Sequence, residues 1–308
     1  MSETVRHTAE RIRKLEVQGA RNVAIAAIKA MQALAEQTKA KNKTAFLKEL
    51  KEAQAMLFAS RETEPLMRNA VRWISTQVEG SSIEKVDAVA ELVVGNVGLF
   101  LQNLDASREC TAEIGAKRIR DGMLVCTHCH SSTVTHMLAK AKAEGKNFSV
   151  ICTETRPAFQ GRITAREMVE LGVETMFIVD SAARSYMGNV DLVVVGADAI
   201  TSEGNVVNKI GTSSIAVLAN EARKPFYVVS ELLKFDPESL YGEYERIEQR
   251  SPAEVWKEAP QKLSVRNPAF DVTPSRYISG LICEEGVIAP QSVAEVMRRA
   301  YPWVFKSI

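Results

Sequence analysis

Two short segments carry side chains suited to acid–base chemistry. Cys126-Thr-His-Cys-His-Ser-Ser132 and Gly196-Ala-Asp-Ala-Ile200 each stand at the carboxyl end of a short apolar run with the character of a buried strand. In an open parallel sheet, ligands bind at that edge. Because the first segment offers a thiol and the second a carboxyl group, we expect a base and an acid that face one substrate.

The Cys126-x-x-Cys129-His130 spacing also matches the motifs of redox, zinc and haem-attachment sites. Haem attachment belongs to exported proteins, and no export signal is visible in the sequence. A zinc site needs a second pair of ligands at related spacing, which the remaining Cys and His residues do not supply. A thioredoxin-like dithiol starts a helix, whereas Cys126 closes an apolar run and is expected to be a buried, inert thiol. We therefore expect no metal and no redox cofactor.

The turn that contains Cys129 has a second property. Ser131, Ser132 or Thr133 can cap a helix that runs to about Glu144, which places Cys129 just ahead of a helix N-terminus. The partial positive charge at such a position favours a thiolate, and a thiolate can take a proton from carbon. The alternative is that Cys129 is a small residue that fills a tight turn.

Two further motifs follow along the chain. Asp198 comes after the apolar run 192–195, and apolar neighbours suit a general acid, although a helix cap or a loop salt bridge is an alternative role for an aspartate. Gly196 allows the backbone to approach a ligand closely. Asn208-Lys-Ile-Gly-Thr-Ser213 precedes a helix predicted over 214–222. Its lysine and free backbone N–H groups predict a cradle for a phosphate or for sugar hydroxyls, and plain capping is the alternative.

The apolar pattern changes near residue 121. Before it, helical spacing predicts helices over 23–34, 46–58 and 66–76 and a long apolar stripe over 86–104. After it, apolar runs that alternate with helical patterns predict strands over 123–126, 148–152, 175–179, 192–195 and 226–229, a loop over 267–274 and a last strand over 277–283. Such alternation implies a parallel sheet covered on both faces. We predict an α/β protein with a helical domain over residues 1–120 and a Rossmann-like domain over residues 121–308.

Composition limits the class of partner. A chain of 308 residues with 46% hydrophobic residues can bury a substantial core. Its 39 basic and 38 acidic residues give a formal net charge of +1, which argues against nucleic acid or an anionic membrane as the main partner. No apolar run reaches transmembrane length, and the first residues lack the apolar core of a signal peptide. We therefore expect a cytoplasmic protein whose five cysteines are free thiols.

Taken together, the motifs resemble one superfamily. It contains ribose-1,5-bisphosphate isomerase, methylthioribose-1-phosphate isomerase and the alpha, beta and delta regulatory subunits of the guanine-nucleotide exchange factor of eukaryotic translation initiation. The matching segments are Thr127-His-Cys-His-Ser131, Thr153-Glu-Thr-Arg-Pro157, Asp180-Ser-Ala-Ala-Arg184, Gly196-Ala-Asp198, Asn208-Lys-Ile-Gly-Thr212 and Lys234-Phe235. The chain is most similar to the ribose-1,5-bisphosphate isomerase branch, and the resemblance extends over nearly its whole length.

The resemblance implies a role for specific residues. Cys129 would be the proton acceptor and Asp198 the proton donor, a pair that the regulatory subunits typically lack. The early loop of the family usually reads Arg-Gly-Ala-Gly, whereas this chain has Gln18-Gly19-Ala20-Arg21, which moves the positive charge from the first to the fourth position. The substrate-binding residues that the resemblance implies are Gln18, Gly19, Ala20, Arg21, Arg61, Ser131, Ser132, Thr133, Asn208, Lys209 and Lys234.

The implied chemistry is an isomerisation without a cofactor. In ribose 1,5-bisphosphate the anomeric oxygen carries a phosphate, so no free aldehyde is available. Cys129 thiolate would remove the C2 proton while Asp198 protonates the departing ring oxygen, and the intermediate would tautomerise to ribulose 1,5-bisphosphate. Two phosphates need two cationic cradles. The candidate cations are Arg21, Arg61, Lys209 and Lys234.

Two alternatives stay open. A methylthioribose-1-phosphate isomerase would use the same acid and base with a hydrophobic pocket in place of the second phosphate site, although His130 and the basic residues favour the bisphosphate. A non-catalytic regulatory subunit would bind a sugar phosphate or nucleotide and dock onto a translation factor. The resemblance also implies a homo-oligomer, a hexamer built from dimers, with adenosine monophosphate as an activator in nucleoside salvage.

Overall fold

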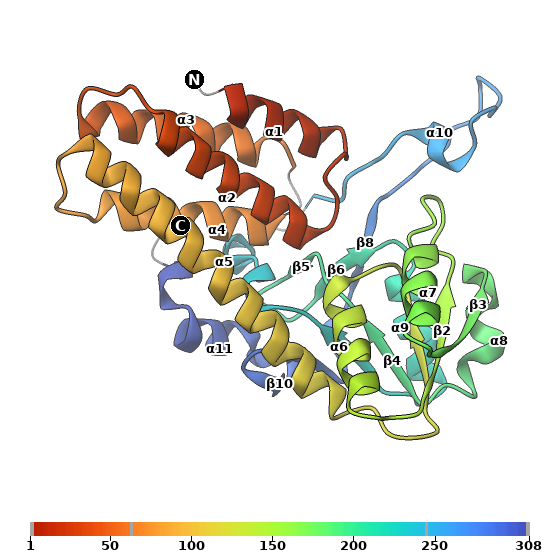
Figure 1. Cartoon of the computed structure of the whole chain (residues 1–308). Coiled ribbons are helices and arrows are strands. Elements are labelled where there is room, and N and C mark those ends of the chain that lie inside the picture. The colour runs from red at the N-terminus through yellow and green to blue at the C-terminus, as the bar shows by residue number, and fades with distance from the viewer. Residues whose placement is uncertain (1–2, 62–63, 244–245, 306–308) are drawn as a thin grey trace.

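The first part of the chain is helical. A computed structural model describes residues 3–61, 64–243 and 246–305 (Figure 1). The helices of the first part are α1 (Glu3–Arg13), α2 (Ala20–Gln37), α3 (Lys43–Phe58), α4 (Pro65–Glu79) and α5 (Val86–Ala116). The predicted helices over 23–34, 46–58 and 66–76 and the apolar stripe over 86–104 are confirmed. α1 was not predicted, although its buried residues Val5, Ala9 and Ile12 have helical spacing.

A mostly parallel sheet follows, with the strand order β10-β9-β7-β4-β1-β2-β3. Its strands are β1 (Leu124–Thr127), β2 (Ser149–Thr153), β3 (Glu174–Ile178), β4 (Leu192–Val195), β7 (Phe226–Val229), β9 (Gly280–Cys283) and β10 (Gly286–Ile288). Only β10 runs antiparallel to its neighbour among the strands described in this sheet. The accompanying helices are α6 (Ser132–Ala143), α7 (Gly161–Glu170), α8 (Ala183–Met187), α9 (Thr212–Glu221) and α11 (Val293–Ala300). The predicted α/β class is confirmed.

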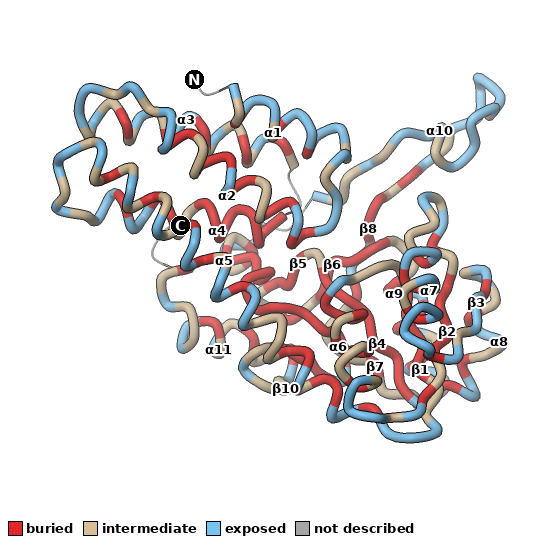
Figure 2. Tube along the Cα trace, in the orientation of Figure 1, coloured by how far each residue is buried: buried red, intermediate tan, exposed pale blue. Residues whose placement is uncertain are grey.

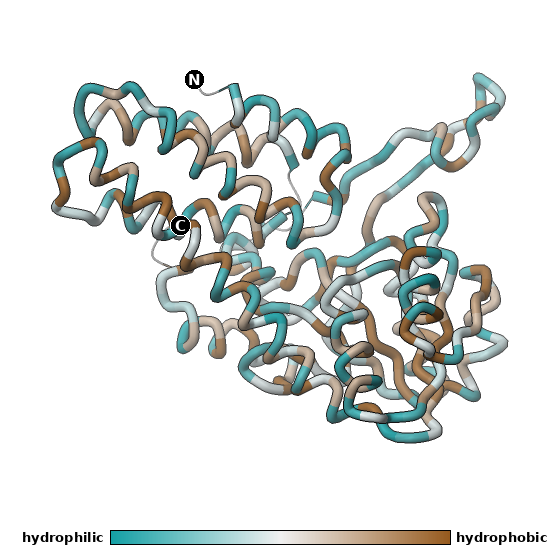
Figure 3. Tube along the Cα trace, viewed as in Figure 1, coloured by the Kyte–Doolittle hydropathy of each residue, from teal (hydrophilic) through white to brown (hydrophobic). Residues whose placement is uncertain are grey.

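Both faces of the sheet are covered, because successive side chains of a strand point to opposite faces. Val125 and Val194 pack on one face with residues of α5 and α6. Cys126 and Val193 pack on the other face with residues of α8 and α9, and this second cluster continues into the N-terminal helices. Figure 2 shows the central strands buried, and Figure 3 shows that they are mainly apolar. The helical region and the sheet therefore share one core.

A small antiparallel sheet corrects two predictions. It consists of β5 (Ala199–Ile200), β6 (Val206–Lys209) and β8 (Phe270–Thr273), in the order β5-β6-β8. Asn208 and Lys209 thus lie on a strand rather than at a free helix start. The expected loop over 267–274 contains β8, because its prolines flank the strand and remove none of its hydrogen bonds. The last predicted strand, over 277–283, is shorter than expected, since a 3₁₀ turn, η4 (Ser275–Tyr277), ends just before β9.

The remaining elements are short. They are η1 (Asp180–Ala182), η2 (Leu232–Lys234), η3 (Pro237–Tyr241), α10 (Pro252–Val255), η5 (Pro290–Ser292) and η6 (Pro302–Phe305). The helical region ends with α5, and the alternation of strands and helices begins with β1. We propose residue 121, which lies between them, as the boundary between two domains. Among the described helices, none combines the length and apolar character that a bilayer crossing requires.

Candidate functional site

A cavity of about 320 Å³ lies at the carboxyl ends of β1 and β4. These strands are neighbours in the sheet, and the chain continues from β1 toward β2 on one side and from β4 toward β7 on the other. Such a reversal is where open α/β sheets bind ligands. The cavity is lined by Leu15, Gln18, Gly19, Ala20, Arg21, Asn22, Arg61, Cys129, His130, Ser131, Ser132, Gln160, Ile163, Ala197, Asp198, Asn208, Lys209, Lys234 and Phe270. All the predicted site residues except Thr133 are among them.

Cys129 has a left-handed backbone, with a φ of 68°. This conformation is uncommon for a residue with a side chain, and it persists only where neighbours hold it. The Cys129 N–H donates to Thr155 Oγ1 at 2.9 Å, and Thr164 Oγ1 donates to the Cys129 carbonyl at 2.9 Å. Thr164 lies on α7, so two segments from outside the turn fix the position of the thiol.

The predicted thiolate is wrong for the ligand-free protein. α6 does begin just after Cys129, with Ser131 as its cap. Burial nevertheless raises the pKa of Cys129 to about 12, and the positive charge of Lys209 counteracts this only in part. Desolvation of the charged form outweighs the helix N-terminus, so the resting site holds a thiol.

This protonation state predicts a pH-dependent reactivity. The rate at which iodoacetamide alkylates Cys129 should rise about tenfold per pH unit between about pH 7 and pH 9, because only the thiolate reacts. Mass spectrometry of the labelled peptide measures the rate separately from that of Cys110, the other partly exposed thiol. A rate that is already maximal at pH 7 would contradict the protonated thiol.

His128 joins the turn after β1 to the turn after β6. Its ring is 2% exposed, and its Nε2 donates to the Ile210 carbonyl at 2.8 Å. Burial lowers the pKa of His128, so the neutral ring accepts the Thr153 hydroxyl at Nδ1, 2.6 Å away. Gly211 is required beside it, because its φ is +102° and a Cβ there would lie 2.9 Å from His128 Nε2.

Asp198 is fixed through its backbone. Its N–H donates to the Val207 carbonyl on β6 at 2.9 Å, and Lys234 Nζ donates to the carbonyl of the preceding Ala197 at 2.8 Å. Gly196 has a packing role that was not predicted. A Cβ at this position would lie 2.5 Å from Ser131 Oγ, so the missing side chain makes room for Ser131. The loops after β1 and β4 thus touch directly.

Two cations of the cavity lie over one aromatic ring. Lys209 Nζ is 5.3 Å and Arg61 Cζ is 5.9 Å from the centroid of Phe270, which pairs with Lys209 in the register of β6 and β8. Arg61 Nε lies 3.2 Å from Glu64, but its Nη1 is buried without a hydrogen-bond partner among the described residues. A buried N–H without an acceptor is rare, and an anionic ligand would satisfy it.

The anion cradle predicted at the start of α9 is wrong for its backbone part, because the N–H groups of Gly211 and Ser213 are already bonded. The Asp271 carboxylate already accepts the N–H of Gly211 at 2.8 Å and the N–H of Ser213 at 3.1 Å. Burial raises the pKa of Asp271 to about 6. The protein therefore supplies its own anion to this helix start, and only the side chains of Asn208 and Lys209 face the cavity from this segment.

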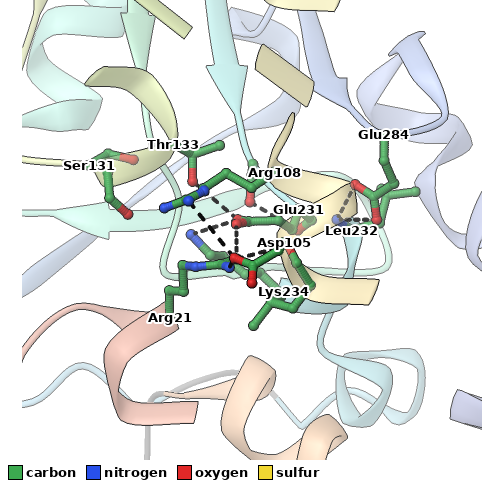
Figure 4. Close-up of polar contacts among 12 residues, drawn as sticks. Arg21, Asp105, Arg108, Ser131, Thr133, Glu231, Leu232, Lys234 and Glu284 are labelled. Carbon is green, nitrogen blue, oxygen red and sulfur yellow. Dashed lines mark hydrogen bonds and ion pairs between the residues drawn. The ribbon is translucent and has the colours of Figure 1, made fainter. Parts of the chain in front are cut away.

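Thr133 and Arg21 both bond Glu231, which lies behind the cavity wall. Thr133 is 1% exposed, does not line the cavity and donates to Glu231 Oε2 at 3.2 Å, which corrects its predicted substrate contact. Arg21 does line the cavity, but its guanidinium bonds Asp105 at 2.5 Å, Glu231 at 3.2 Å and the Leu104 carbonyl at 2.9 Å (Figure 4). Arg21 thus lines the cavity with a guanidinium that already bonds two carboxylates, and its contact with a phosphate stays a prediction.

Glu284 lies next to this cluster (Figure 4). It accepts the Leu232 N–H at 3.1 Å and the Tyr301 hydroxyl at 2.7 Å, yet burial raises its pKa from 4.5 to about 7. Because the folded protein then holds a proton that the unfolded chain releases, the free energy of unfolding should fall as pH rises from about 4.5 to about 7.

Glu284→Gln should remove this part of the pH dependence. Between pH 4.5 and pH 7.5, wild type should lose on the order of 2 kcal/mol relative to the variant. Urea unfolding at several pH values measures the difference. Parallel pH profiles for the two proteins would show that Glu284 titrates normally.

Several lining residues were outside the sequence prediction: Leu15, Asn22, Gln160, Ile163, Ala197 and Phe270. For Phe270 a signal existed, because alternation over 270–273 marks a short strand, but the flanking prolines masked it. The others come from turns and helix starts without a distinctive pattern. Across the described part of the chain, no group of three or more His, Cys, Asp and Glu side chains is placed to hold a metal ion.

Comparison with known proteins identifies the family. The family model described as "Initiation factor 2 subunit family" matches residues 16–290. The chain is 40% identical to ribose 1,5-bisphosphate isomerase of Thermococcus kodakarensis, over 97% of this chain and 95% of that protein. It is 35% identical to methylthioribose-1-phosphate isomerase of Pelotomaculum thermopropionicum, over 92% of this chain and 82% of that protein. The solved structure of the Pyrococcus horikoshii translation initiation factor eIF-2B superposes with a TM-score of 0.81 at 28% identity, covering 94% of this chain and 98% of that one. The chain belongs to the initiation factor 2 subunit family.

Proposed function

We propose that the protein is a sugar-phosphate isomerase that converts ribose 1,5-bisphosphate into ribulose 1,5-bisphosphate. One observation carries this proposal: Cys129 and Asp198 follow neighbouring strands and line the same cavity as Arg61, Lys209 and Lys234. A thiol, a carboxyl group and cations around one cavity are what proton transfer on an anionic sugar needs. The names of relatives that match nearly the whole chain support the same substrate.

The reaction begins at C2 of the sugar. Cys129 thiolate takes the C2 proton, the electron pair forms the C1–C2 double bond, and the bond from C1 to the ring oxygen breaks. Asp198 gives its proton to the ring oxygen, which becomes the C4 hydroxyl. The product of this step is an enol that keeps both phosphates.

The second step returns Asp198 and Cys129 to the protonation states in which they began the first step. The enol hydroxyl at C2 returns a proton to the Asp198 carboxylate and becomes the ketone, while the Cys129 thiol returns a proton to C1. The product is the isomeric ketose, and no electron leaves the substrate. Since the resting Cys129 is a thiol, its proton must pass to a base before the first step; the Asp198 carboxylate in the same cavity takes it and so becomes the acid, and the positive charge of Lys209 stabilises the thiolate that remains.

Three cations of the cavity can hold the phosphates. Arg61 has a buried N–H without an acceptor among the described residues, and Lys209 and Lys234 line the same cavity. We assign these three to the phosphates, with hydroxyl and amide contacts from Ser131, Ser132 and Asn208 and backbone contacts from the loop over 18–21.

A second candidate is methylthioribose-1-phosphate isomerase. It is favoured by the apolar side chains of Leu15 and Ile163, which also line the cavity and suit a thiomethyl group. The third candidate, a non-catalytic regulatory subunit, has no need of the thiol and carboxyl that face the cavity.

Proton NMR in heavy water tests these candidates. Purified protein is incubated with ribose 1,5-bisphosphate in one tube and methylthioribose 1-phosphate in another, each with and without adenosine monophosphate. We expect the bisphosphate to become a ketose that carries deuterium at C1. Conversion of only the methylthio substrate would identify the second candidate, and no conversion in any tube would support the regulatory subunit.

The cellular setting belongs to the same proposal. We propose a cytoplasmic hexamer built from dimers that acts in nucleoside salvage and is activated by adenosine monophosphate. Light scattering of the purified protein gives the number of subunits, and a rise in turnover on adding the nucleotide in the NMR assay tests the activation.

A further inference from the structure

Glu231 is a buried carboxylate that the proposed chemistry does not use. It follows β7, is 0% exposed and is not among the residues that line the cavity. Burying a charge is unfavourable unless partners compensate for it. The partners of Glu231 therefore show what the carboxylate does.

Three cavity-forming elements meet at this one side chain (Figure 4). Arg21 Nη1, from the start of α2, lies 3.2 Å from Oε1. Thr133 Oγ1, from the start of α6, donates to Oε2 at 3.2 Å, and Lys234 Nζ, from η2, lies 3.6 Å from Oε2. Burial alone would raise the pKa of Glu231, but Lys234 and Arg21 lower it overall, so the group stays charged.

The contacts of Lys234 continue toward the acid. The same ammonium group donates to the Ala197 carbonyl at 2.8 Å, and Ala197 directly precedes Asp198. A displacement of Lys234 would therefore alter the position of a cation in the cavity and the position of the backbone that carries Asp198.

We infer that Glu231 is a positioning residue of the isomerase: it fixes Lys234, and through the Ala197 carbonyl the Asp198 loop, against the cavity. This inference rests on the proposed function. The competing interpretation is a purely structural ion pair that joins α2 to the sheet.

Glu231→Gln separates the two interpretations. A carboxylate has two acceptor oxygens, whereas an amide has one oxygen and one NH₂ group. The NH₂ group must therefore face either Arg21 or the Thr133 and Lys234 pair. Because it cannot accept a hydrogen bond, the cation on that side must move. Since small displacements of positioning groups have large kinetic effects, we expect kcat to fall about tenfold to a hundredfold with a smaller change in KM.

The kcat of a double variant distinguishes a positioning role from a purely structural one. If Glu231 acts through Lys234, the Glu231→Gln and Lys234→Met changes should not add, and the double variant should have the kcat of Lys234→Met alone. Glu284→Gln is the matched control. It changes the adjacent, partly exposed glutamate, whose side chain accepts hydrogen bonds from Leu232 and Tyr301, both outside the cavity lining, so kcat should stay within about twofold of wild type.

Each outcome decides the inference. Wild-type kcat in Glu231→Gln, or losses that multiply in the double variant, would overturn it while the isomerase activity stands. If Glu231→Gln does not fold, Thr133→Val removes one contact to the carboxylate, and an unchanged kcat in that variant would overturn the inference. If wild type turns over neither sugar phosphate, the proposed function fails. The crystal structure of Glu231→Gln then decides, since Arg21 and Lys234 that both keep their positions would refute the positioning role.

Discussion

Cys129→Ser should lower kcat on ribose 1,5-bisphosphate by about a thousandfold, because a hydroxyl is a far weaker acid than a thiol and scarcely forms the anion that takes the C2 proton. The serine has nearly the same shape, so the left-handed turn held by Thr155 and Thr164 should persist. Substrate binding should therefore be retained. NMR turnover and calorimetric titration with the substrate measure the two quantities.

A matched control exists for this thiol. Cys110 is the other partly exposed cysteine, and its Sγ donates to the Glu284 carbonyl outside the cavity. Cys110→Ser should leave turnover unchanged. Equal turnover of Cys129→Ser and wild type would remove Cys129 from the mechanism.

Asp198→Asn should lower kcat about a hundredfold to ten-thousandfold, the usual contribution of a general acid. An amide keeps the shape of the carboxyl group but cannot protonate the ring oxygen. The Asp198 N–H bond to Val207 does not involve the side chain, so the loop should keep its conformation. Turnover in heavy water, measured with saturating substrate, gives the effect on kcat.

The control for Asp198 comes from the opposite end of the same strands. Asp191 accepts the Leu124 N–H at 2.8 Å, at the amino ends of β4 and β1. Asp191→Asn should leave kcat unchanged, whatever it does to stability. A similar loss of kcat in both variants would mean that the effect is on the fold and not on proton transfer.

The larger elements could be predicted because each carries its signal within a few neighbouring residues. The strands over 192–195 and 226–229 are continuous apolar runs, and they end where predicted. β5, β6 and β8 were missed because none of them holds an apolar run longer than two residues: β5 has two residues, β6 ends in Asn208 and Lys209, and β8 contains Asp271. Strands without such a run have no clear pattern in the sequence.

The site was likewise predicted only in part. Its residues could be listed from motifs, but their partners could not. Arg21 is expected to be a phosphate ligand because of its charge, while the two carboxylates that bond it lie 84 and 210 residues later in the chain. The thiolate expected at Cys129 failed for a related reason: a helix start is visible in the sequence, whereas the desolvation that opposes it depends on what packs around the turn.

The Asp271 carboxylate at the start of α9 has a consequence for how this scaffold acquires new substrates. A phosphate held by main-chain N–H groups is recognised by the backbone, which point mutations barely alter. Here the Asp271 carboxylate already occupies the N–H groups of Gly211 and Ser213, so in the proposed site anion recognition would depend on side chains such as Arg61 and Lys209. Single substitutions can then exchange a charged for an apolar substituent on the sugar without rebuilding the fold, and one acid–base pair can serve relatives with different substrates.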